Sequence, residues 1–175
     1  YAADLWSDPE ENRRFFAEMG LTAEQITPVK ADAETLPFEK AFFDAVVSTD
    51  SYNYFGRDPA DLDAKLLPFV KPGGYIYIAI PGMKKDRHDD LPPELLLSWT
   101  PEQMDYMHDA AYWTDMVGRC RGAEVLEVSE MESNEEVWAD WLKQENEYAV
   151  GDRKSMEAGG GKYLNFIKIV LRKKA

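Results

Sequence analysis

Strand-like segments that run directly into acidic or small polar residues constrain the fold of this chain most strongly. They end at Asp4, at Asp32 and at Ser48-Thr49-Asp50. The order strand, helix, strand, loop, strand, helix, strand predicts a parallel sheet with right-handed crossovers. Residues at the carboxyl ends of such strands face one crevice, where open α/β sheets bind ligands. Short carboxylates at two of these ends suit the hydroxyls and the exocyclic amine of a nucleoside.

Local signals predict the remaining elements. Asp8-Pro9 is typical of a helix start, because Asp caps free N–H groups and Pro fits the first turn. Residues 75–80 (YIYIAI) form the clearest strand pattern. A helix is expected from residue 100 to about 120, and an amphipathic one over 134–148. The alternation over 163–171 favours an antiparallel closing strand.

Composition limits the classes of protein to consider. The chain has 175 residues, of which 45% are hydrophobic, and this suits one globular domain. Its 33 acids and 20 bases leave a net charge of −13, which argues against nucleic acid as a partner. A single cysteine, Cys120, excludes an internal disulfide and fits the cytoplasm. No apolar run is long enough to predict a membrane span. One domain over residues 1–175 is expected, with a lid or substrate insertion at about 82–105.

Four motifs stand in a recognisable order. They are Asp4-Leu5-Trp6, then Asp32-Ala33 followed by a Leu-Pro-Phe triplet, then FDAVVS at 43–48 and LPFVKPGG at 67–74. In these residues the chain resembles the class I S-adenosylmethionine-dependent methyltransferases. It is most similar to the small-molecule "type 11" branch, whose pattern is D-A-x-x-L-P-F, F-D-x-V and L-K-P-G-G. The likeness covers residues 1–82 closely and the terminal strand pair loosely, whereas residues from about 83 to 160 show little of it.

The resemblance implies a Rossmann-like α/β sheet, mostly parallel with an antiparallel C-terminal strand, and S-adenosyl-L-methionine as the cofactor. In that family the acid after the second strand holds the ribose, which corresponds to Asp4. The D-A pair reads adenine through a carboxylate and a backbone N–H, which corresponds to Asp32 and Ala33. The apolar residues after the first acid enclose the adenine, here Leu5 and Trp6.

The end of the next strand is the expected acceptor side. The resemblance puts Ser48 and Thr49 near the methionine moiety, and a small-molecule methyl acceptor beside them. Methyl transfer needs mainly in-line positioning, and a base only where the acceptor must lose a proton. Asp50, Tyr52 and His108 are therefore weak candidates for catalysis, and the catalytic residue stays unknown. His88 and His108 have no partners at a metal-ligand spacing, so no metal site is predicted.

One departure from the family concerns the glycine-rich loop after its first strand. No such loop occurs in these residues, and Gly159–Gly161 does not replace it because no parallel strand precedes it. The missing first strand would lie between the strands that end at Asp4 and at Asp50. We therefore expect a truncated piece of a longer enzyme, in which the first strand and the glycine-rich loop are missing.

Two other functions stay open. A nucleotide-cofactor oxidoreductase of the NAD type also uses an acid after the second strand, although it has no need of the Asp32-Ala33 pair. A non-catalytic interaction protein that has kept the fold is the second alternative. A homo-oligomer also stays open.

Overall fold

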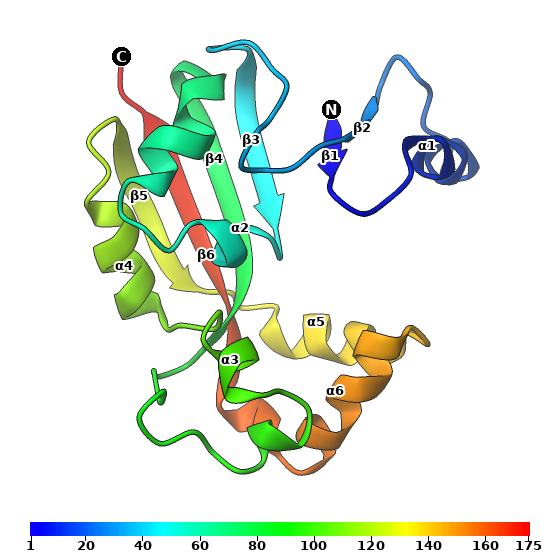
Figure 1. Ribbon diagram of the computed structural model, residues 1–175, viewed down its shortest axis with the longest axis vertical. Coiled ribbons are helices and arrows are strands. Elements are labelled where there is room, and N and C mark those ends of the chain that lie inside the picture. The colour runs from blue at the N-terminus through cyan, green and yellow to red at the C-terminus, as the bar shows by residue number, and fades with distance from the viewer.

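The computed structural model describes all 175 residues, which form a mixed α/β arrangement (Figure 1). It also contains four short 3₁₀ or π turns, at Leu62–Leu66, Leu67–Phe69, Leu95–Leu97 and Gly160–Lys162. The helices and strands, in chain order, are β1 (Ala2–Asp4), α1 (Pro9–Glu18), β2 (Pro28–Lys30), β3 (Phe43–Thr49), α2 (Tyr52–Phe55), β4 (Val70–Met83), α3 (Pro101–Met104), α4 (Ala110–Gly118), β5 (Ala123–Glu130), α5 (Asn134–Trp141), α6 (Glu147–Glu157) and β6 (Leu164–Lys173).

The strands form two sheets. β1 and β2 pair in parallel, whereas the larger sheet has the order β3-β4-β6-β5. β3 and β4 are parallel, and β6 runs antiparallel to both of its neighbours. The predicted sheet, mostly parallel with an antiparallel C-terminal strand, is confirmed. β3 pairs with β4 alone, so its other edge faces β1 and β2, and Val47 on it is 72% exposed. Figure 1 shows the β1–β2 pair and α1 beside that edge.

Two apolar clusters hold the structure together. The larger one packs the branched side chains of β4 and β6, such as Ile78 and Ile169, against Trp113 of α4 and the turn at 62–69. Burial of each such side chain contributes about 1.5–3 kcal/mol. The smaller cluster lies beyond the end of β4 and joins the segment 95–104 to α5 and β6. Its buried members are Met83, Leu95, Trp99, Met104, Trp138 and Leu164.

Two of the predicted helices are wrong in their extent. The expected helix over 100–120 is interrupted, because Asp109 caps a new helix by accepting the Tyr112 N–H at 2.9 Å. The expected helix over 134–148 ends at Trp141. Asn146 then caps α6 through the Ala149 N–H at 2.9 Å, a helix that the sequence pattern did not indicate. No helix is both long and apolar enough to cross a membrane.

Candidate functional site

A cavity of about 850 Å³ lies between β3 and the β1–β2 pair. It runs along the free edge of β3 from Phe43 to Thr49 and includes the residues at the carboxyl ends of β1, β2 and β3. This size is ordinary for a site that binds a small molecule or cofactor. The residues predicted to bind the cofactor all line it, and so do Asp50 and Tyr54. Those predicted residues are Asp4, Leu5, Trp6, Asp32, Ala33, Ser48 and Thr49.

Asp4 closes the turn after β1 with one carboxylate oxygen. Its Oδ1 accepts the N–H groups of Trp6 at 2.8 Å and Ser7 at 2.5 Å. The hydrogen bond from the Ser7 N–H is the main reason why the pKa of Asp4 is lowered, so the group is ionised at neutral pH. No hydrogen bond within the chain involves its Oδ2, which leaves an acceptor for a ligand hydroxyl.

Asp32 has the same arrangement at the end of β2. Its Oδ1 accepts the Glu34 N–H at 2.8 Å, and the side chain is exposed. The Ala31 N–H donates to the Asp4 carbonyl oxygen at 3.0 Å, which ties the ends of the two strands together. Two carboxylates with one oxygen each held in a turn and the other free therefore stand at one end of the cavity.

Apolar side chains and an unpaired hydroxyl complete this wall. Trp6 is 85% exposed and Leu5 is 43% exposed, so both offer apolar surface that the fold itself does not bury. Ser48 lies on β3, and its Oγ is buried without a hydrogen-bond partner in the chain. A buried hydroxyl normally has a partner. Ser48 thus has hydrogen-bonding capacity for a bound molecule.

Asp50 turns the chain from β3 into α2. Its backbone adopts φ 44°, a left-handed conformation that Asp tolerates better than most residues. Its N–H donates to the Ala79 carbonyl oxygen at 2.8 Å. Desolvation, and then the carboxyl group of Asp152, raises the pKa of Asp50 to about 6. An acid with this pKa changes charge near neutral pH, as a proton carrier requires.

Tyr52 and Tyr54 lie on the same short helix but in different environments. Tyr52 is 1% exposed and packs in the larger apolar cluster against Trp113. It does not line the cavity, unlike Asp50. Tyr54, two residues later, lines the cavity, and its ring centroid lies 5.0 Å from that of Tyr106.

Asp152 of α6 is the partner that raises the pKa of Asp50. Desolvation also raises the pKa of Asp152, and the Trp141 Nε1–H donates to its Oδ2 at 2.8 Å. Trp141 belongs to α5, so two helices of the later part of the chain place a carboxyl group near the end of β3. This association of distant segments had no signal in the sequence.

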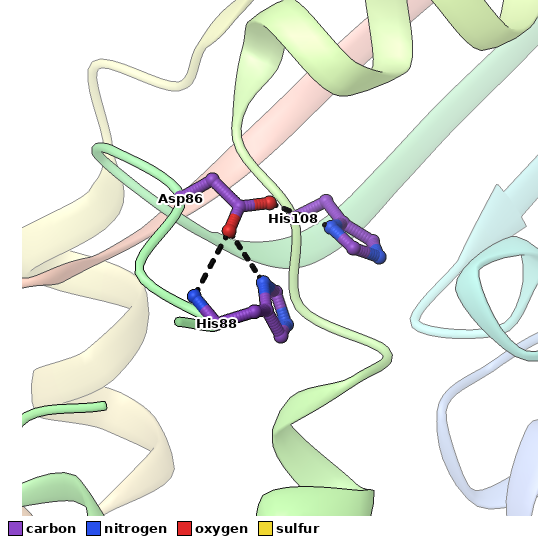
Figure 2. Close-up of side chains that lie close together, drawn as sticks. All are labelled: Asp86, His88 and His108. Carbon is purple, nitrogen blue, oxygen red and sulfur yellow. Dashed lines mark hydrogen bonds and ion pairs between the residues drawn. The ribbon is translucent and has the colours of Figure 1, made fainter. Parts of the chain in front are cut away.

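His108 lies outside the cavity, in the segment before α4. It is 9% exposed, and its Nδ1 lies 2.9 Å from Asp86 Oδ2. His88 Nδ1 lies 2.5 Å from the other oxygen of the same carboxylate, Oδ1 (Figure 2). Desolvation lowers the pKa of His108. At His88 desolvation also acts to lower the pKa, but the hydrogen bonds to Asp86 and to the Met104 carbonyl oxygen, together with the nearby carboxylates, outweigh it and raise the pKa. The sequence spacing of these three residues did not predict that they meet.

The glycine-rich segment at 159–161 has a structural role. Gly159 has φ 86° and ends α6, and Gly160 approaches Ser155 so closely that a Cβ would lie 2.7 Å from its carbonyl oxygen. Both glycines serve the connection from α6 to β6, away from the cavity. As expected, this segment does not replace a cofactor-binding glycine loop.

The geometry defines an α/β protein with a cavity that includes the strand ends, and comparison with known proteins agrees on the fold. Residues 6–78 match the family described as "Methyltransferase domain". No curated protein matches the chain by sequence. The resemblance to S-adenosylmethionine-dependent methyltransferases is thus confirmed in the part of the chain that carries its motifs.

Several solved structures share the fold. A candidate sarcosine dimethylglycine methyltransferase from Galdieria sulphuraria has a TM-score of 0.71 at 18% identity, over 98% of this chain and 68% of that one. The [4+2]-cyclase SpnF has a TM-score of 0.65 at 16% identity, over 99% and 65%. Geranyl diphosphate C-methyltransferase from Streptomyces coelicolor A3(2) has a TM-score of 0.67 at 12% identity, over 98% and 61%. The chain spans about two thirds of the length of these proteins and has the class I methyltransferase fold.

Proposed function

We propose that this chain binds S-adenosyl-L-methionine and transfers its methyl group to a small-molecule acceptor by in-line displacement. The pair Asp4 and Asp32 carries the proposal, because each carboxylate stands at a strand end with one oxygen held in a turn and the other free. The match of residues 6–78 to a methyltransferase domain supports the same cofactor. S-adenosyl-L-methionine supplies an activated methyl group on a sulfonium.

The wall residues have the chemistry that this cofactor needs. Asp4 would accept from the ribose hydroxyls, and Asp32 would accept from the adenine amine while the Ala33 N–H meets a ring nitrogen. The exposed apolar surfaces of Leu5 and Trp6 would enclose the adenine, since flat apolar groups gain from leaving water. Ser48 and Thr49 would contact the methionine part, where the buried Ser48 hydroxyl lacks a partner.

We place the acceptor beyond the end of β3, next to Asp50 and Tyr54. Alignment of the acceptor atom with the methyl group and exclusion of water are the main contributions of the protein, on the order of 7–11 kcal/mol in favourable cases. Asp50 can take a proton from an acceptor, because its pKa of about 6 suits a base near neutral pH. His108 does not line the cavity, which argues against it as the base.

The acceptor-selecting residues come from the later part of the chain in this proposal. Segment 82–105 forms the smaller apolar cluster with α5 and β6, and α6 brings Asp152 near Asp50. We propose that this region, within the single domain 1–175, covers the acceptor. Structures with the same fold include methyltransferases and a cyclase, so the fold alone does not determine the reaction.

A binding titration followed by a transfer assay tests this function. We expect calorimetry to detect binding of S-adenosylmethionine and of its demethylated product, and no binding of NAD. A screen with tritium-labelled cofactor against pools of amines, carboxylates and thiols should then identify a labelled acceptor. Binding of NAD alone would support an oxidoreductase, and binding of neither cofactor would favour a non-catalytic interaction protein.

A further inference from the structure

A compact group of three metal-ligating side chains lies outside the cavity, beyond the end of β4. Asp86 and His88 come from the loop after that strand, and His108 comes from the segment that leads into α4. One ligand atom from each, a carboxylate oxygen or an imidazole nitrogen, lies within 4.8 Å of the other two. Figure 2 shows the Asp86 carboxylate beside the two imidazole rings, with one oxygen directed to each residue.

The hydrogen bond of His88 to the backbone determines which of its nitrogens is available. His88 Nε2 lies 2.9 Å from the Met104 carbonyl oxygen, which can only accept, so Nε2 carries the hydrogen. In neutral His88 the lone pair is then on Nδ1, 2.5 Å from Asp86 Oδ1. Two atoms with lone pairs repel at this distance unless a positive charge lies between them. A proton fits between two atoms 2.5 Å apart, and a metal ion could take the place of this proton once the carboxylate has moved back from the ring.

A carbonyl oxygen behind an imidazole is also the usual outer partner of a metal-bound histidine. Such a hydrogen bond sets the tautomer and the ring orientation of the ligand. His88 therefore already has the tautomer and the support that metal binding needs. His108 Nδ1 faces the second oxygen of Asp86 at 2.9 Å, so a second nitrogen is directed to the same place.

The backbone holds the two segments in this arrangement. The Met83 N–H donates to the His108 carbonyl oxygen at 3.2 Å, and the Asp86 N–H donates to Asp109 Oδ2 at 3.1 Å. The His108 ring stacks on Tyr112, with 3.6 Å between the ring centroids. The three side chains thus meet through contacts of the fold itself. Binding of an ion would require the Asp86 carboxylate to move away from the two imidazoles, because its present distances of 2.5 and 2.9 Å are those of direct hydrogen bonds.

We propose that Asp86, His88 and His108 form a binding site for a first-row divalent cation such as Zn²⁺ or Co²⁺. The ligands are Nδ1 of both imidazoles and the Asp86 carboxylate, with Met104 as the outer support of His88. Two imidazoles and one carboxylate suit these borderline cations better than Mg²⁺ or Ca²⁺, which prefer oxygen alone. Three protein ligands leave at least one coordination position open, as in catalytic zinc sites. The site departs from the expectation that the chain holds no metal.

Titration of the full chain with Co²⁺ tests the proposal through a readout other than activity. We expect visible d–d absorption of a tetrahedral or five-coordinate Co²⁺ complex with one ion per chain, and displacement of that ion by Zn²⁺. His88→Gln should weaken binding on the order of 100-fold, since it removes a direct ligand and even outer partners contribute 10- to 100-fold. His88 is partly exposed, so this variant is expected to fold.

Asp90→Asn serves as the matched control, because Asp90 is an exposed acid of the same loop outside the cluster. Its Co²⁺ affinity should equal that of the unchanged chain. Circular dichroism without metal shows whether each variant is folded, and Asp86→Asn provides a second ligand variant should His88→Gln unfold. Absence of a Co²⁺ spectrum, or equal affinity in His88→Gln and the unchanged chain, would leave a hydrogen-bonded cluster and refute the metal site.

Discussion

Replacement of Asp32 by Asn tests whether its free carboxylate oxygen binds adenine or whether the residue only forms a turn. Asn keeps an oxygen that can accept the Glu34 N–H, now at 2.8 Å, so the turn is expected to persist. The substitution removes the charge and turns an amide donor toward the adenine amine. Loss of one hydrogen bond to a charged group costs about 1.5–3 kcal/mol. At about 1.4 kcal/mol per factor of ten, affinity should fall about 10- to 140-fold.

Calorimetry with S-adenosylhomocysteine measures this change directly, and Asp8→Asn is its matched control. Asp8 also accepts a backbone N–H at 2.8 Å with one carboxylate oxygen, but it caps α1 and does not line the cavity. The two variants remove one negative charge each from the same part of the chain. Equal affinities for Asp32→Asn, Asp8→Asn and the unchanged chain would show that Asp32 has a turn role alone, and would refute the adenine assignment.

Three further predictions test ligand binding, proton binding and core packing separately. Trp6→Ala should weaken cofactor binding about 2- to 12-fold by loss of aromatic contact. The midpoint of thermal unfolding should hardly change, because Trp6 is 85% exposed. Unchanged affinity would exclude Trp6 from the adenine site. Asp50→Asn should flatten the pH dependence of stability. The pKa of Asp50 is about 6 in the folded chain and about 3.9 in the unfolded chain. Between these pH values the native state binds more protons than the unfolded state. The unchanged chain therefore loses stability relative to Asp50→Asn as the pH rises from about 4 to about 6. Denaturant titrations give the free energy of unfolding of both proteins across that pH range. The same pH dependence in the unchanged chain and in Asp50→Asn would contradict the reasoning. Ile78→Ala should cost about 2–5 kcal/mol of unfolding free energy in urea, whereas Val47→Ala on the exposed edge should change it by less than about 0.5 kcal/mol; similar losses in both would contradict the assignment of the core.

That Asp4 and Asp32 lie on the same cavity could be predicted from sequence, because local structure places each of them. Asp4 and Asp32 each follow their own strand within a few residues, and parallel strands bring their carboxyl ends to one edge. The pattern needed no knowledge of distant contacts. The strand over 75–80 was also recognised, although pairing with β6 extends it to Val70–Met83.

The prediction of the helix boundaries after residue 100 was wrong because of contacts that the helical pattern does not reveal. The apolar pattern continues across the break between α3 and α4. Two contacts interrupt the helix: Asp109 caps the start of α4, and the Met83 N–H donates to the His108 carbonyl oxygen. The Asp109 cap is local, but its signal competes with a helical pattern. The contact between Met83 and His108 joins residues far apart in the chain. Tertiary contacts override local preference in such segments.

The approach of Asp152 to Asp50 could not be predicted from sequence, because the two residues meet only in three dimensions. Asp50 lies on the connection from β3 to α2 and Asp152 lies on α6, yet the second carboxyl group contributes to the raised pKa of the first. The same holds for Asp86, His88 and His108, whose ligand atoms lie within 4.8 Å of one another although about twenty residues separate His88 from His108. The residues that we propose for the nucleoside belong to short motifs, whereas those that we propose for an acceptor or a metal ion depend on how the later segments pack. Structures with the same fold include methyltransferases and a cyclase, so the arrangement of the strands alone does not determine the reaction.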